Sequence, residues 1–174
     1  MNQYTLDIPY PPVTDLDMNI EYGQIMLSNL GGLYSEMNAV SLYFYNQIIL
    51  ENCWKELANA MHCVSVVEMH HLEIFAQMAC RLGVDPRLWE CKNDFLEYWS
   101  PGYNVYPRQI NTMLENAIVQ EKHTIHLYQQ QIAYIQEPTI QEALKRIILD
   151  EEHHVQIFES FLNEYNQTHK EPYQ

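Results

Sequence analysis

The sequence has few basic residues. Lysine and arginine together number 9 against 23 aspartates and glutamates, so the formal net charge at pH 7 is −14, and neither basic residue occurs before Lys55. A chain this acidic repels nucleic acid and anionic membrane surfaces, and its first residues lack the basic segment of an export signal. We therefore expect a cytoplasmic protein that binds neither nucleic acid nor membranes.

Long apolar runs and paired cysteines are also missing. The stretch 40–50 is too short to span a bilayer, and Ser41, Asn46 and Gln47 interrupt it. The four cysteines form no Cys-x-x-Cys pair, which excludes a zinc ribbon and a rubredoxin-type iron centre. We expect these cysteines to be reduced thiols.

Prolines and glycines divide the 174 residues into a single predicted domain with four helices. Short connections make the first two and the last two helices antiparallel neighbours, and the long link between these pairs crosses the bundle. The expected fold is an all-α four-helix bundle with one long crossover, as in ferritin-like proteins. A Gly31-Gly32 pair inside the first helix predicts a close helix crossing. The predicted segments are an extended arm 1–17, helices 18–51, 54–82, 108–136 and 139–165 within a bundle 18–165, and a polar tail 166–174.

Each predicted helix carries an apolar stripe at alternating spacings of three and four residues, which is typical of the inward face of a bundle helix. Acidic and histidine residues interrupt these stripes. Two interruptions are Glu-x-x-His pairs, at 68–71 and again 83 residues later, and residues three apart share one helix face. A lone glutamate on each of the other helices completes a set of six candidate metal ligands: Glu36, Glu68, His71, Glu121, Glu151 and His154.

The charge of these six residues predicts what binds them. Breaking up a buried charged pair costs roughly 3–5 kcal/mol, and the stripes offer little lysine or arginine. Two divalent cations would balance four carboxylates, with the histidines as neutral ligands. For one such residue, a satisfied core side chain is the simpler explanation, but six residues in matching register favour two metal ions. We expect each ion to have one histidine and to be bridged and flanked by carboxylates.

Several further residues have two possible roles. Tyr43 and Tyr128 each lie seven residues after a lone glutamate, so each hydroxyl either bonds a ligand carboxylate or carries an electron out, or belongs to an ordinary core tyrosine. Asp150 either orients a ligand histidine or lies at the surface. The remaining candidates are off the stripes, and we expect them to be at least partly exposed: His70, His123, His126, His153, Glu115 and Glu152.

The chain resembles the rubrerythrin-like branch of the ferritin-like superfamily across most of residues 20–165. The resemblance implies the same six ligands, two iron or two manganese ions, and hydrogen peroxide or dioxygen as substrate. The segment GGLYSEM at 31–37 is also similar to the first-helix motif of manganese catalases. The stretches that carry the main resemblance are SEMNA at 35–39, VEMHHLEI at 67–74, QEKH at 120–123 and IILDEEHH at 147–154.

The chain departs from these families in three ways. It has no rubredoxin segment to deliver electrons. It lacks the additional carboxylate that rubrerythrins carry three residues from the lone glutamate of the third helix, because Ile118 and Thr124 occupy those positions. It also has a second Glu-x-x-His pair on the fourth helix, which classical ferritins lack, so storage in a large hollow shell is not favoured.

Three functions follow from these observations. The first is an oxidoreductase that uses hydrogen peroxide or O₂ at a dinuclear iron or manganese centre, either as a catalase or as a peroxidase with a separate electron-donor protein. The second is an iron-sequestering protein with slow oxidase activity, and the third is a purely structural bundle. The ligand set accepts both iron and manganese. The tyrosine-rich apolar surface and the N-terminal arm predict at least a dimer.

Overall fold

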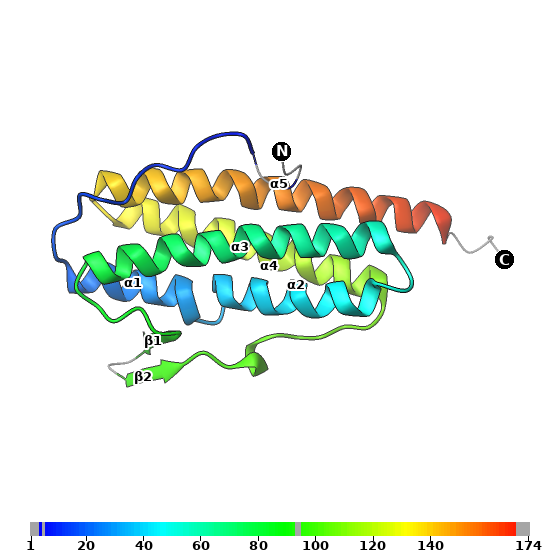
Figure 1. Cartoon of the computed structure of the whole chain (residues 1–174), viewed down its shortest axis with the longest axis horizontal. Helices are drawn as coiled ribbons and strands as arrows, with labels where there is room; N and C mark the ends of the chain where they lie inside the picture. The colour runs from blue at the N-terminus through cyan, green and yellow to red at the C-terminus, as the bar shows by residue number, and fades with distance from the viewer. Residues whose placement is uncertain (1–3, 5, 93–94, 170–174) are drawn as a thin grey trace.

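The computed structural model describes residue 4 and residues 6–92 and 95–169. These residues form five α-helices, one β-hairpin and one short 3₁₀ helix (Figure 1). In chain order the elements are α1 (Ile20–Gly31), α2 (Glu36–Leu50), α3 (Lys55–Arg81), β1 (Trp89–Lys92), β2 (Phe95–Tyr98), η1 (Pro101–Tyr103), α4 (Ile110–Tyr134) and α5 (Pro138–Thr168).

The helices make a four-helix bundle in which α1 and α2 together occupy one position. Figure 1 shows α3 running back alongside α1 and α2, with α4 and α5 as a second antiparallel pair. The crossover leaves the end of α3 and passes along the bundle to its opposite end, where α4 begins. This arrangement confirms the predicted all-α bundle with one long crossover.

The prediction of one continuous helix over 18–51 is wrong. The helix ends at Gly31, and α2 begins at Glu36 after Ser35, whose φ of −102° and ψ of 161° are extended. A Cβ atom on Gly31 would lie 2.7 Å from the backbone nitrogen of Trp89, so the glycine admits the backbone of β1. The expected close helix crossing is therefore replaced by a close approach of the hairpin. As a result, Glu36 lies in the first turn of a new helix.

The crossover contains regular structure that the sequence analysis did not predict. Strands β1 and β2 pair antiparallel, with Trp89 opposite Tyr98. Two hydrogen bonds then fasten the crossover to α2, because Trp99 Nε1 donates to Asn38 Oδ1 at 2.7 Å and Asn104 Nδ2 donates to the Asn38 carbonyl at 3.1 Å. The crossover thus covers α2 beside Glu36.

The other helices begin and end within three residues of their predicted limits. The structure continues α5 to Thr168, into the predicted tail, and residues 170–174 of that tail lie outside the described part. Among the described residues, no helix has the length and apolarity needed to cross a membrane.

The described residues of the N-terminal arm lie along the bundle outside any helix or strand. Figure 1 shows the arm passing over α5 before it turns into α1. Tyr4 and Val13 are buried there, and Arg81 Nη1 on α3 donates to the Thr14 carbonyl at 3.2 Å. The arm therefore packs against α3 and α5.

Two apolar clusters fill the bundle and leave its middle to polar residues. One joins α1 to the C-terminal half of α3 and the first half of α5, with Met26 and Phe75 among its buried members. The other joins α2 to the N-terminal half of α3 and the second half of α5, with Leu42 and Phe158 among its members. The polar residues between these clusters form the candidate site.

Candidate metal centre

The structure brings all six candidate ligands together in the middle of the bundle. Helices α2 and α4 each contribute one glutamate, and α3 and α5 each contribute one Glu-x-x-His pair. All six side chains are buried, with at most 2% of any residue exposed. The apolar stripes of the sequence therefore located the residues correctly on the inward faces.

The six residues form two overlapping groups of four. Within each group, one potential ligand atom per residue lies within 4.8 Å of those of the other three. Each group has one histidine, one glutamate of its own and two glutamates that belong to both groups. The first group is Glu36, His71, Glu68 and Glu151, and the second is Glu121, His154, Glu68 and Glu151.

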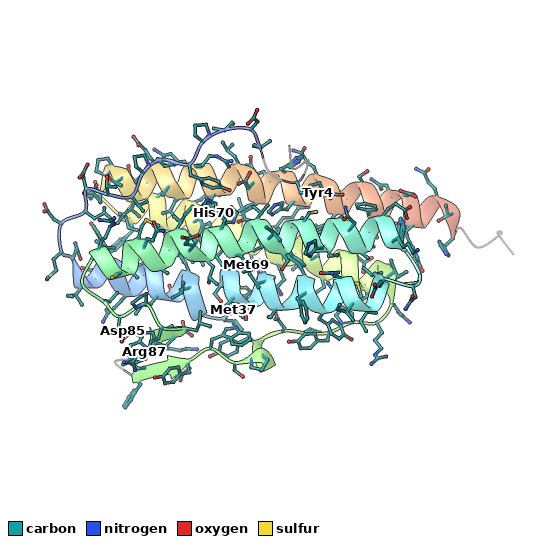
Figure 2. The ribbon with its side chains drawn as sticks, viewed as in Figure 1. Tyr4, Met37, Met69, His70, Asp85 and Arg87 are labelled. Carbon is teal, nitrogen blue, oxygen red and sulfur yellow. The ribbon has the colours of Figure 1, made fainter. Side chains whose placement is uncertain are left out.

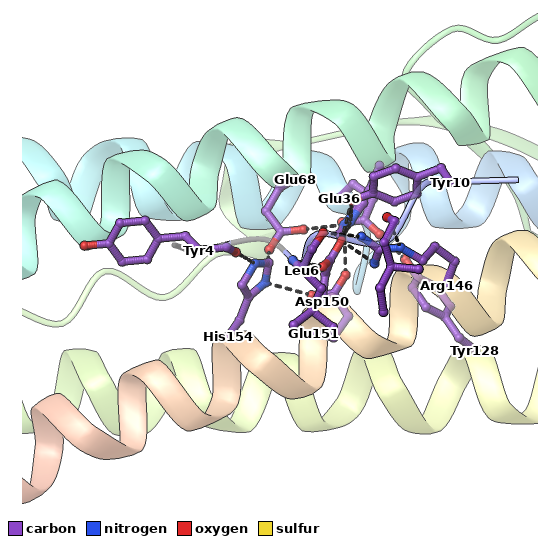
Figure 3. Close-up of polar contacts among 12 residues, drawn as sticks. Tyr4, Leu6, Tyr10, Glu36, Glu68, Tyr128, Arg146, Asp150, Glu151 and His154 are labelled. Atoms are coloured by element: carbon purple, nitrogen blue, oxygen red, sulfur yellow. Dashed lines mark hydrogen bonds and ion pairs between the residues drawn. The ribbon is translucent and has the colours of Figure 1, made fainter. Parts of the chain in front are cut away.

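The two shared glutamates have a bridging orientation. Glu68 points Oε2 at His71 Nδ1 and Oε1 at His154 Nδ1, both at 3.0 Å. Glu151 points Oε1 at His71 Nδ1 at 3.0 Å and Oε2 at His154 Nδ1 at 3.2 Å. Figure 3 shows Glu68 from α3 and His154 from α5 meeting between their helices. Each shared carboxylate thus directs one oxygen toward each half of the site.

These distances fit two bound cations. Two ligands at right angles, each about 2.1 Å from one ion, lie about 3 Å apart. Glu68 Oε1 and Glu151 Oε1 are buried and have no hydrogen-bond partner among the described residues, although a histidine nitrogen lies 3.0 Å from each. Such oxygens are costly to bury unless a cation occupies the common point. A set of carboxylates with one imidazole per ion suits hard, divalent first-row metals.

Without bound cations, protons neutralise part of the negative charge of the buried glutamates. Burial and the charges of Glu151 and Glu68 raise the pKa of Glu36 well above its ordinary value. Burial and the charges of the same two residues raise the pKa of Glu121 in the same way. The two unshared carboxyl groups therefore favour the protonated form.

The pKa values of His71, His154 and Glu68 shift in the directions that favour their charged forms. Burial acts to lower the pKa of His71 and of His154, but Glu151 and Glu68 respectively outweigh it, so both values rise well above normal. Burial acts to raise the pKa of Glu68, but His154 and His71 hold it below its usual range. Both metal ions would compete with these protons for the same atoms.

Two buried tyrosines hold the unshared carboxylates crosswise. Tyr43 on α2 donates its hydroxyl hydrogen to Glu121 on α4, and Tyr128 on α4 donates to Glu36 on α2. Each of these bonds joins α2 to α4, so each tyrosine contacts the glutamate of the other helix. Burial and neighbouring carboxylates raise the pKa of both tyrosines, so the hydroxyls stay protonated donors.

The outer nitrogens of the two histidines have different acceptors. His71 Nε2 lies 3.3 Å from Asp150 Oδ2, whereas His154 Nε2 lies 3.1 Å from the backbone carbonyl of Tyr4. Asp150 is fully buried, which decides between the two roles left open by the sequence in favour of orienting a histidine. Burial acts to raise the pKa of Asp150, but hydrogen bonds from His71 and Tyr10 hold it below its usual range.

Sequence reasoning missed three residues around Asp150. Arg146 Nη1 lies 2.8 Å from Asp150 Oδ2, and the arm contributes the Tyr10 hydroxyl and the Leu6 backbone N–H, the latter at 3.1 Å. The guanidinium of Arg146 also stacks 4.2 Å from the centre of the Tyr10 ring. Arg146 precedes Asp150 by four residues on one helix, a spacing at which opposite charges meet, so this pair was visible in the sequence.

The candidates placed off the stripes lie outside the cluster, as expected. His70, His123 and His126 are exposed, and so are Glu115 and Glu152. His153 is half-buried. His123 packs edge-on against Tyr34, with ring centres 5.0 Å apart.

A small cavity lies beside Glu121. Its volume is about 10 Å³, close to the space that one water molecule needs. Its walls come from α2, α4 and the crossover, and they include Ala39, Tyr43 and Asn104. A molecule of about the size of water fits at this edge of the site.

We compared the chain with known protein families and with curated proteins. The family model described as rubrerythrin matches residues 32–166. No match was found among curated proteins.

Solved structures share the fold at low sequence identity. The manganese catalase KatB from Anabaena superposes with a TM-score of 0.80 at 17% identity, covering 97% of this chain and 83% of that one. A Rhodobacter capsulatus bacterioferritin has a TM-score of 0.72 at 20% identity, covering 87% of this chain and 89% of its own. The bacterioferritin BfrA from Mycobacterium tuberculosis has a TM-score of 0.72 at 21% identity, covering 88% and 92%. These likenesses confirm the predicted ferritin-like fold.

Proposed function

The chain belongs to the rubrerythrin family, and we propose that it is an oxidoreductase that acts on hydrogen peroxide or O₂ at a dinuclear iron or manganese centre. The observation that carries this proposal is the orientation of Glu68 and Glu151, each of which directs one oxygen toward each of two histidines. A purely structural bundle would not need to bury four glutamates and two histidines in one cluster, because removing charged groups from water carries a large desolvation cost.

Each proposed ligand has a defined part in the centre. Glu36 and His71 would hold one ion, Glu121 and His154 the other, and Glu68 and Glu151 both. When bound, a pair of adjacent redox metals would supply two-electron chemistry and Lewis-acid polarisation to an oxygen substrate.

The protein supplies the surroundings of this centre. Tyr43 and Tyr128 orient the two unshared carboxylates and are close enough to exchange protons with them. The apolar clusters on both sides exclude bulk water from the middle of the bundle. The cavity beside Glu121 offers space for a molecule of about the size of water at the edge of the centre.

Catalase-like turnover is the specific reaction that we favour. Two molecules of hydrogen peroxide give one O₂ and two waters, so the reaction needs no external electron donor. The likeness to a manganese catalase across 97% of the chain supports this choice. Peroxidase turnover would require a separate electron-donor protein.

Iron sequestration is the second candidate. Structural likeness to two bacterioferritins favours it, and the one from Rhodobacter capsulatus has a dinuclear site. In such a protein, the same ligands would bind ferrous iron, O₂ would oxidise it slowly, and the ferric iron would pass on for storage.

Metal analysis followed by peroxide turnover tests the proposal. The protein is purified without chelator, loaded with manganese or iron, and assayed for bound metal and for O₂ release from hydrogen peroxide. We expect two ions per chain and O₂ release, loss of both in Glu68→Ala, and retention of both in the exposed control Glu115→Gln. Many ferric ions per chain would instead support sequestration. A protein that binds no metal would contradict both functions.

A further inference from the structure

The two halves of the site are built from a repeat, but the repeat is incomplete. Asp150 immediately precedes the shared glutamate of α5, whereas Val67 immediately precedes the shared glutamate of α3. The carboxylate that supports the histidine of one half therefore has no equivalent in the other half. Both positions are buried, so the difference lies inside the protein.

The histidine of the first group is supported by a charged acceptor. Asp150 Oδ2 lies 3.3 Å from His71 Nε2, and Arg146 at 2.8 Å keeps the carboxylate in place. The Tyr10 hydroxyl, which itself donates to Asp150, lies 3.1 Å from the same nitrogen. The arm adds the Tyr10 hydroxyl and the Leu6 N–H as further donors to Asp150. Arg146 in turn donates to the carbonyls of Ile8 and Leu6, at 2.9 and 3.1 Å, so arm and acceptor are fixed together.

The histidine of the second group is supported by a neutral acceptor. His154 Nε2 lies 3.1 Å from the Tyr4 carbonyl, where the arm passes over α5. Figure 3 shows Tyr4 beside His154. The arm thus substitutes a backbone dipole for the missing carboxylate.

These two acceptors act differently on a metal-bound imidazole. A carboxylate draws the Nε2 proton more strongly than a carbonyl does, because the hydrogen bond is charge-assisted, and this makes Nδ1 a stronger donor to the metal. Such outer partners typically change metal affinity by about 10- to 100-fold.

We propose that the two metal positions are unequal, that the ion at Glu36 and His71 binds more tightly, and that Tyr4, Leu6 and Tyr10 of the arm position both histidines. The proposal rests on the dinuclear site proposed above. The weaker ion, at Glu121 and His154, lies next to the small cavity. The more weakly held ion would therefore be the one that faces an incoming substrate.

Titration of metal-free, full-length protein with Mn²⁺ tests the inequality. Calorimetry should resolve two steps whose affinities differ by about 10-fold or more. Asp150→Asn should weaken the tighter step by about 10- to 100-fold and leave the other nearly unchanged. Deletion of residues 1–4 should weaken mainly the second step, whereas Tyr4→Phe, which keeps the carbonyl, should weaken neither.

A spectroscopic readout covers the case in which Asp150→Asn folds poorly. In zinc-loaded protein labelled with ¹⁵N-histidine, the Nε2 proton of His71 should resonate further downfield than that of His154. Tyr10→Phe, which removes one donor to Asp150 and keeps the carboxylate, should move only the His71 signal. Two equal steps in the wild type, or equal Nε2 signals, would overturn the inequality but not the dinuclear site. Absence of metal binding would overturn both.

Discussion

The hydroxyl of Tyr128 on α4 donates a hydrogen bond to the carboxylate of Glu36 on α2. Both residues are buried, and the bond joins the two helices that contribute unshared glutamates. Tyr43 and Glu121 repeat the bond in the opposite direction. Each half of the chain therefore positions the unshared candidate ligand carboxylate of the other half.

Replacement of this tyrosine by phenylalanine should affect both stability and metal affinity. Tyr128→Phe removes the buried hydroxyl that donates to Glu36, so we expect a loss of about 1 kcal/mol in the free energy of unfolding. We also expect a loss of roughly 10-fold in affinity at one metal position. Chemical denaturation and metal titration measure the two effects.

A matched control is available on the same helix. Tyr134 on α4 also donates to a glutamate, Glu21, but both side chains are exposed. Tyr134→Phe should therefore change neither quantity measurably. Equal effects of Tyr128→Phe and Tyr134→Phe would contradict a special role for the buried bond.

Shared and unshared carboxylates should differ in metal stoichiometry. Glu68 faces both histidines, so Glu68→Gln should reduce bound metal from two ions per chain toward none. Glu36 belongs to one group only, so Glu36→Gln should leave about one ion. Elemental analysis after gel filtration checks both, with the exposed Glu73→Gln on α3 as control. Loss of only one ion in Glu68→Gln would argue against bridging.

The bundle and the positions of the six clustered residues could be predicted because charge inside an apolar repeat is visible in one sequence. Glu68 and His71 occupy positions where the stripe requires leucine or isoleucine, and the same exception recurs 83 residues later. Helical spacing then fixes the shared face without knowledge of distant contacts.

The remaining features depend on contacts that leave little trace in the sequence. Gly31 marked an unusual position, but its partner, the backbone of β1, lies far along the chain. The bond from Tyr128 to Glu36 depends on how two helices are staggered, which periodicity within one helix does not reveal. The Tyr4 carbonyl exists in every residue type, so no side chain identifies it as the acceptor for His154.

The stability of metal-free protein should fall as pH rises. Burial and neighbouring carboxylates raise the pKa of Glu36 and Glu121 above 4.5 in the folded state. The carboxylates, against burial, raise the pKa of His71 and His154 above 6.5. These groups bind more protons folded than unfolded, so their contribution is complete below the unfolded values and is lost as pH rises through the folded ones.

Bound metal should reverse this trend. Metal ions replace the same protons, so the stabilisation that they provide grows with pH. The difference in Tm between manganese-loaded and metal-free protein should increase steadily from pH 6 to pH 8, measured by differential scanning calorimetry. A difference that is constant over this range would show that the ions bind away from these groups.

Narrowing the small cavity should slow turnover without removing metal. Ala39 lines the cavity beside Glu121, and Ala39→Leu adds three carbon atoms to a space of about 10 Å³. We expect kcat/KM for hydrogen peroxide to fall about 10-fold or more while metal content stays at the wild-type level. Ala133→Leu, at an exposed position of α4, is the control. An unchanged kcat/KM in Ala39→Leu would show that substrate arrives by another route.

An apolar groove between α2 and α3 is where we expect a second copy of the chain to bind. Figure 2 shows Met37 and Met69 on this face, and the groove, of about 310 Å³, has no acidic residue, lysine or arginine among its described lining. Phe44, at 61% exposed, and Met69, at 56%, project large apolar side chains beside it. Neighbouring exposed apolar side chains of this size are typical of interaction surfaces.

Introducing a negative charge into the groove tests this expectation. Met69→Glu would bury an unpaired carboxylate in the interface, so the dimer expected for the wild type at micromolar concentration should become a monomer. Sedimentation velocity measures the change. Val119→Glu places the same charge on an apolar residue of α4 that is similarly exposed, at 51%, and should leave the dimer intact. A monomeric wild type would contradict the expectation, and equal dissociation in both variants would place the interface elsewhere.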